Sequence, residues 1–222
     1  MNDANPAMAI GHGLPPATSL GPVRAARWLA FLFLLLAPGP VASDVDHWVI
    51  DPDHFAVAFL VDHAGYAATL GLFLEAEGEF RFDPEDYRLE SGSFVVQTGS
   101  VFTNHDERDQ HLRSEDFLDV ENHPEMRFEA TSWERTGDEG GRLHGQLELL
   151  GERRPLVLET RINKVDRYPF PLGGIFSRPY VLGASMRGAF NRSDFGMNYG
   201  LRPLEIVGDR VELIIEFEAQ RQ

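Results

Sequence analysis

Beyond residue 43, apolar side chains recur at every second position, and this alternation constrains the fold more than any other feature. In segment 211–218, Val211, Leu213, Ile215 and Phe217 lie on one face and glutamates lie on the other. Successive side chains of a strand point to opposite faces of its sheet, so such a segment predicts a strand with one buried face. We predict eight or nine strands, from alternation or strand-like composition, at 48–50, 55–61, 79–82, 94–102, 126–130, 143–149, 156–165, 181–190 and 211–218.

Turn-forming residues separate these segments, at 83–86, 137–141 and 173–174. Antiparallel strands with one apolar face can close into a barrel, which leaves no free sheet edge. A sandwich of two sheets is the rival architecture, because strand number alone does not separate the two. Only residues 104–114 have a helical pattern, with Asn104 or Asp106 as its N-cap. We therefore predict an all-β, eight-stranded antiparallel barrel with a short helix at one end.

The first 43 residues have the pattern of a secretory signal peptide. Arg24 and Arg27 precede the apolar run Trp28–Ala37, and the small residues Ala42 and Ser43 follow a Pro/Gly break. The apolar run is about half of the ~20 residues that span a bilayer as a helix, so a retained anchor is the weaker alternative. We expect cleavage after Ser43 and a domain at 44–222, with no stable membrane span after cleavage.

Net charge and cysteine content exclude several classes of function. The net charge of −15 would repel nucleic acid, and no cluster of basic residues offsets it. The chain has no cysteine, which rules out disulfides, thiolate catalysis and cysteine-ligated metals.

Four blocks of sequence carry a family resemblance. The longest is Arg108–Val120, RDQHLRSEDFLDV, followed by His123-Pro124 and Arg127-Phe128. The others are Ile50–His54 with Phe59, His63 and Gly65; Gly71–Phe73; and Leu147–Gly151 with Arg192–Met197. In their order along the chain, these blocks resemble the YceI-like polyisoprenoid-binding family over roughly 48–218. Phe55 departs from the family pattern, which usually has a small hydroxyl residue there, and could reshape the cavity.

The resemblance implies a lipocalin-like barrel, periplasmic or secreted, that holds an isoprenoid lipid such as a polyprenyl compound or the tail of a quinone. No cofactor other than such a lipid is expected, and the chain would be a monomer or homodimer. Aromatic and aliphatic residues at inward strand positions would line the cavity, although the alternative for many of them is a solid core. The predicted lining residues are Phe55, Val57, Phe59, Phe73, Phe80, Phe82, Phe94, Val96, Phe128, Leu147, Phe190, Leu213 and Phe217.

A polar cluster at 105–123 raises the question of catalysis or metal binding. His105 and His111 are six residues apart, which puts them on different faces of a helix, and arginines lie between the acids. Ser114, His111 and Asp109 could be assembled as a triad, but no nucleophile-elbow motif supports it. We expect a structural network at the barrel mouth, with no catalytic residue and no metal. Its predicted members are Asp109, His111, Arg113 and Asp116. Arg192 and Asp194 are also expected at the barrel mouth, where they would pair with each other in a charged turn.

The connection 163–180 is rich in aromatic residues, Pro and Gly, and is too long for a tight hairpin. It is interpreted either as a lid over the cavity or as an inert connection. The main functional hypothesis is a lipid carrier that is not an enzyme. The alternatives are an enzyme or redox helper that acts on a quinone through residues 105–123, and an envelope interaction protein that uses its acidic surface.

Overall fold

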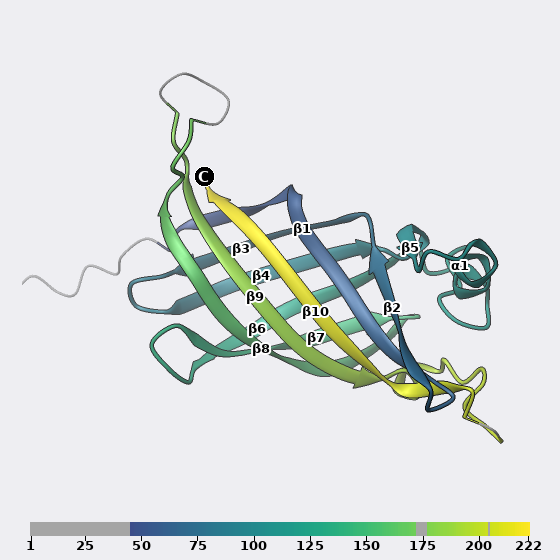
Figure 1. The fold of residues 1–222 in the computed structure, drawn as a ribbon. Coiled ribbons are helices and arrows are strands. Elements are labelled where there is room, and N and C mark those ends of the chain that lie inside the picture. Colours follow the sequence, from purple (N-terminus) through teal and green to yellow (C-terminus); the bar gives the residue numbers. More distant parts are fainter. Residues whose placement is uncertain (1–44, 172–176, 204) are drawn as a thin grey trace, which may run out of the picture. The chain divides into compact units, whose positions relative to one another are not determined.

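The computed structural model describes residues 45–171, 177–203 and 205–222 (Figure 1). The proposed signal peptide and the predicted turn at 173–174 lie outside the described residues. Eight strands form one ring in which all neighbours are antiparallel, and β10 pairs with β1 to close it. The ring consists of β1 (His47–His63), β3 (Ala76–Asp83), β4 (Arg88–Gln97), β6 (Glu125–Arg135), β7 (Gly140–Leu149), β8 (Glu152–Arg167), β9 (Tyr180–Asn191) and β10 (Val207–Arg221). The predicted eight-stranded barrel is confirmed, and the sandwich alternative is wrong.

A bulge near the start of β1 joins two segments that the sequence predicted as separate strands. Ile50 pairs with Ala219 of β10, and the next pair is Phe55 with Phe217, so the four residues Asp51–His54 stand opposite Glu218 alone, and β1 has three residues more than its partner here. Extra residues on one strand change which alternate positions face inward. This is why the inward positions are even-numbered before the bulge, at Trp48, and odd-numbered after it.

Two short strands complete the wall. β2 (Ala67–Phe73) pairs with the second half of β1, and β3 pairs with its beginning, so β2 and β3 follow the same edge of β1 in succession. The sequence reading did not predict β2 as a strand. The predicted strand 94–102 is divided into β4, a 3₁₀ turn η1 (Thr98–Ser100) and β5 (Val101–Phe102), and β5 pairs with the end of β2.

The predicted helix is present as α1 (Asp106–Arg113), beside β5 at one end of the barrel (Figure 1). Its N-cap is His105, whose ring nitrogen accepts a hydrogen bond from the Arg108 amide at 3.3 Å, so the predicted caps Asn104 and Asp106 are wrong. Acidic residues fill the first turn of α1, where the helix dipole favours negative charge. Over the described residues, no helix is both long and apolar enough to cross a bilayer.

At the opposite end, aromatic side chains fill the barrel. Trp48 is fully buried, donates its indole N–H to the Phe82 carbonyl at 2.9 Å, and stacks on Phe80 with ring centroids 6.2 Å apart. Phe82 packs edge-on against Trp133 at 5.8 Å. This half of the interior is therefore a packed core.

In the half near α1, two aromatic rings lie over glycines. A Cβ on Gly71 would fall 2.1 Å from the Phe59 ring, and one on Gly145 would fall 2.2 Å from the Phe128 ring. The rings occupy the space that side chains at these positions would need. They therefore lie against the wall, and this half of the barrel stays open.

Candidate functional site

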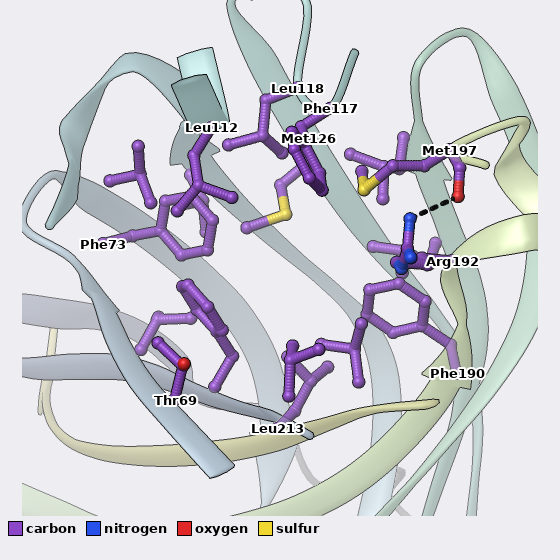
Figure 2. A pocket seen from close by; sticks show the side chains of 18 of the residues that line it. Thr69, Phe73, Leu112, Phe117, Leu118, Met126, Phe190, Arg192, Met197 and Leu213 are labelled. Carbon is purple, nitrogen blue, oxygen red and sulfur yellow. Dashed lines mark hydrogen bonds between the residues drawn. The ribbon is translucent and has the colours of Figure 1, made fainter. Parts of the chain in front are cut away.

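A cavity of about 360 Å³ occupies the half of the barrel next to α1 (Figure 2). This volume is within the range of about 300–1,000 Å³ that is usual for small-molecule pockets. Every strand of the ring except β3 contributes to its wall, and nearly all of the wall is apolar. The site is a slot for a hydrophobic molecule, with few groups that could hold a polar one.

The exposed residues of the lining locate the opening. Asp62 and His63 at the end of β1, Arg108 of α1, and Tyr199 and Ile206 before β10 line the cavity and are exposed to solvent. All of them lie at the α1 end of the barrel. A ligand would therefore enter from this end, with polar groups at the opening and apolar walls below it.

Most of the predicted lining residues line this cavity. Ten of the thirteen do so: Phe55, Val57, Phe59, Phe73, Phe94, Val96, Phe128, Leu147, Phe190 and Leu213. The other three, Phe80, Phe82 and Phe217, line a second cavity of about 40 Å³ in the packed half, and Phe94 borders both cavities. That these residues contact a lipid stays a prediction.

Several lining residues were not predicted. Leu149, Leu156, Leu158, Met186 and Val211 lie on strands and have the inward parity, so the alternation itself could have found them. Leu112, Phe117, Leu118 and Met197 lie on α1 or in irregular segments and close the upper part of the cavity, as Figure 2 shows. Alternation could not find these four residues, although all of them lie within the family blocks Arg108–Val120 and Arg192–Met197.

Asp109 anchors α1 to the chain that precedes it. This carboxylate is 3% exposed, and its Oδ1 accepts hydrogen bonds from the Thr103 amide at 2.8 Å and the Thr103 hydroxyl at 2.5 Å. Arg108 donates to the same hydroxyl and to the Thr103 carbonyl, each at 2.7 Å. Asp109 therefore has a structural role as a buried acceptor with its partners in place.

The other members of the predicted network are also engaged. Arg113 donates to the carbonyls of Gly99 and Val101 at 2.8 and 2.7 Å, which fastens the end of α1 to the η1–β5 segment. His111 bonds Asp116 at 3.0 Å. Ser114 is the C-cap and donates its hydroxyl to the His111 carbonyl, so its predicted place at the helix end is confirmed.

The polar side chains of residues 105–123 that the structure describes are not arranged as a metal site or as a catalytic triad. Among the described residues, no three His, Asp or Glu side chains converge as metal ligands. Ser114 is bonded to a backbone carbonyl, and Asp109 is bonded to Thr103 rather than to His111. His111 instead packs edge-on against the rings of Phe117 and Tyr199, with centroids 4.9 and 4.7 Å away.

Arg192 is a buried cation in the cavity wall (Figure 2). It is 1% exposed and donates to four carbonyls, those of Met197, Tyr199, Val207 and Gly208, at 2.7–2.8 Å. The expected local pair with Asp194 is wrong: the guanidinium turns inward and ties the 3₁₀ turn η2 (Arg192–Phe195) to the start of β10, whereas Asp194 is exposed. Burial lowers the pKa of Arg192, and the charge of Asp209 partly opposes this effect.

The connection 163–180 is shorter than the sequence suggested, because β8 extends to Arg167 and β9 begins at Tyr180. Tyr168 and Phe170 contact each other edge-on at 6.5 Å, and residues 172–176 lie outside the described part. None of its described residues lines the large cavity. The lid interpretation therefore has no support in the described residues.

A closed antiparallel barrel with a hydrophobic slot open at one end defines a lipocalin-like ligand-binding barrel. Residues 48–219 match the YceI-like domain family, and the chain belongs to this family.

Comparison with individual proteins agrees with this assignment. The UPF0312 protein of Serratia proteamaculans is 35% identical over 190 residues, which cover 85% of this chain and 92% of that protein. Among solved structures, Burkholderia cenocepacia BcnA has the same fold, with a TM-score of 0.65 and 16% identity over 76% of this chain and 98% of that one. A polyisoprenoid binding domain from Saccharophagus degradans has a TM-score of 0.57 and 11% identity, covering 80% of this chain and 99% of that one.

Proposed function

We propose that this chain binds one isoprenoid lipid, a polyprenyl chain or the tail of a quinone, inside the barrel and carries it by sequestration. The observation that carries the proposal is the apolar cavity of about 360 Å³ that opens at the α1 end. The polyisoprenoid-binding domain of the same fold supports the choice of ligand. The signal-like sequence of residues 1–43 supports export to the periplasm or beyond.

Burial of hydrocarbon supplies the binding free energy in this proposal. Each methylene-sized group moved from water into the slot contributes about 0.8 kcal/mol. Association costs at least about 4 kcal/mol in lost translational and rotational freedom. Two isoprene units, with about ten carbons, already exceed this lower bound. A polar head group would stay at the opening, near Arg108, His111 and Tyr199.

A binding role is favoured over a catalytic one by the engagement of the polar side chains. Asp109, Arg113 and Ser114 are bonded to groups within the fold, and those bonds hold α1 over the barrel. His111 and Arg108 border the cavity but are also bonded, to Asp116 and Thr103. Their arrangement stabilises the rim of the slot.

Lipid extraction of the protein purified from its native host, followed by mass spectrometry, tests the proposal. We expect a bound prenyl compound in the wild type. Leu147→Trp places an indole in the cavity, since Leu147 is 5% exposed and lines it, and should abolish lipid retention. Val157→Trp is the matched control, because Val157 is 40% exposed and does not line the cavity.

Circular dichroism would show that both variants keep the barrel. Wild-type protein without any lipid, both as purified and after incubation with solanesol, would refute the proposed function. Equal lipid retention in Leu147→Trp and Val157→Trp would place the lipid somewhere other than in this cavity.

A further inference from the structure

Two cavities lie in line inside the barrel, and a thin partition separates them. The large one opens at the α1 end, and the small one, of about 40 Å³, lies in the packed half. Phe94 of β4 and Met186 of β9 line both cavities, so their side chains are the wall between the two. Both are well buried, at 8% and 4% exposed.

Three phenyl rings form the centre of the partition. Phe55, Phe94 and Phe217 contact one another in a triangle, with ring centroids 6.1–6.4 Å apart. Phe55 faces the large cavity only, and Phe217 faces the small cavity only. The triangle therefore spans the thickness of the partition, and Met186 completes it. These four residues are named the cavity floor.

We propose that the cavity floor sets the length of apolar chain that the protein accepts, and that Phe94 and Met186 are its specificity-determining residues. The proposal rests on the proposed function and deepens it. A chain that enters at the α1 end stops at the floor, and any further carbons stay at the opening in contact with water. Since each carbon outside the slot loses its burial, the floor discriminates between chains that differ only in length.

The space behind the floor makes the proposal testable. Truncation of Phe94 or Met186 would connect the large cavity with the small one. The small cavity is lined by apolar side chains such as Leu143, Ile162 and Leu182, so it would accept hydrocarbon. The connected slot should favour longer prenyl chains than the wild type does.

The experiment measures which prenol binds. Delipidated full-length protein is incubated with an equimolar mixture of farnesol, geranylgeraniol and solanesol, and the complexes are counted by native mass spectrometry. Phe94→Ala and Met186→Ala should each raise the ratio of the longer prenols to farnesol by about tenfold, which corresponds to two additional buried methylene groups. Two separate variants keep the test decisive if one of them does not fold.

Two control variants distinguish a deeper cavity from a general loosening of the core. Leu143→Ala enlarges the small cavity but leaves the floor closed, so its length ratio should equal that of the wild type. Ala184→Leu fills the small cavity, and the double variant Phe94→Ala/Ala184→Leu should return the ratio to the wild-type value.

The outcomes distinguish this inference from the proposed function. If the wild type binds none of the three prenols, the proposed function fails and the length-setting floor fails with it. If the wild type binds prenols, and folded Phe94→Ala or Met186→Ala binds them with an unchanged length ratio, only the floor proposal is overturned. An equal shift in Leu143→Ala would also overturn it.

Discussion

The glycine at position 71 keeps the Phe59 ring out of the lumen, and Gly71→Ala tests this. In the wild type, a Cβ at residue 71 would lie 2.1, 2.5 and 2.7 Å from three atoms of that ring, whereas ordinary contact begins near 3.4 Å. The ring would have to move by more than about 1 Å. It cannot move through the wall, so it must swing into the cavity or rotate from its rotamer.

The cost follows from known overpacking effects. Added methyl groups in a well-packed site destabilise by about 1–3 kcal/mol. For a domain of this size each kcal/mol lowers the melting temperature by roughly 2–4 °C. We therefore expect Gly71→Ala to melt about 4–8 °C below the wild type for a central cost of about 2 kcal/mol. The displaced ring should also weaken retention of a prenyl lipid.

Differential scanning calorimetry of the delipidated protein measures this effect. Gly137→Ala is the matched control, because nothing lies within 4 Å of a Cβ there and the substitution removes the same freedom from the unfolded chain. Phe59→Leu/Gly71→Ala should melt above the value expected from adding the two single effects, since the smaller side chain relieves the contact. Equal melting temperatures for Gly71→Ala and Gly137→Ala, with additive behaviour of the double variant, would refute the reasoning.

Two further predictions concern polar groups. Arg192→Met should destabilise the barrel by about 3–5 kcal/mol in urea unfolding, because it removes the buried donor that four carbonyls share. Arg192→Lys should recover little of this stability, because an ammonium cannot reproduce the guanidinium fork, and full recovery by Lys would contradict the reasoning. The hydrogen bond that the His54 ring donates to the Asp51 carboxylate raises the pKa of His54 above its ordinary 6.5. For Asp51, burial raises the pKa, but the hydrogen bonds that it accepts from His54 and the Asp53 amide outweigh burial and hold its pKa below 3.8. The contribution of His54 to the free energy of unfolding is thus complete below pH 6.5 and is lost as the pH rises through the pKa of His54 in the folded protein. The contribution of Asp51 is present above pH 3.8 and is lost as the pH falls below that value. NMR titration should show the His54 midpoint falling toward 6.5 in Asp51→Asn, and an unchanged midpoint would contradict the pairing.

The sequence predicted the strands of the barrel well because alternation is a property of each strand alone, whereas the family resemblance favoured a closed barrel over a sandwich. Alternation in segments such as 143–149 and 211–218 fixes which face is buried, and eight such strands need only pair with their neighbours. The prediction failed where the structure departs from regular pairing. The bulge at Asp51–His54 made β1 appear as two separate strands, 48–50 and 55–61, and β2 was not recognised as a strand although Leu72 and Phe73 follow Gly71.

The site could be predicted only in part, because two of its components lack local signals. Phe117, Leu118 and Met197 close the cavity from irregular segments, and their positions depend on contacts such as the bonds from Arg113 to the Gly99 and Val101 carbonyls. Arg192 reads in sequence as a surface charge beside Asp194. Its burial becomes evident only when β9 and β10 bring its four carbonyl acceptors around it.

Whether an inward phenylalanine opens or closes this barrel depends on the glycine beside it and on the rotamer of the ring. The Phe59 ring lies over Gly71 on the adjacent strand, so it covers the wall and leaves the lumen free. Phe80 also faces a glycine, Gly92, yet only its Cβ lies close to that position, and its ring packs against Trp48 and Phe217 in the interior. A glycine opposite a phenylalanine therefore gives the ring a place against the wall, but it does not by itself leave the lumen open. The neighbours that receive the ring decide which half of the barrel is a slot and which half is a core.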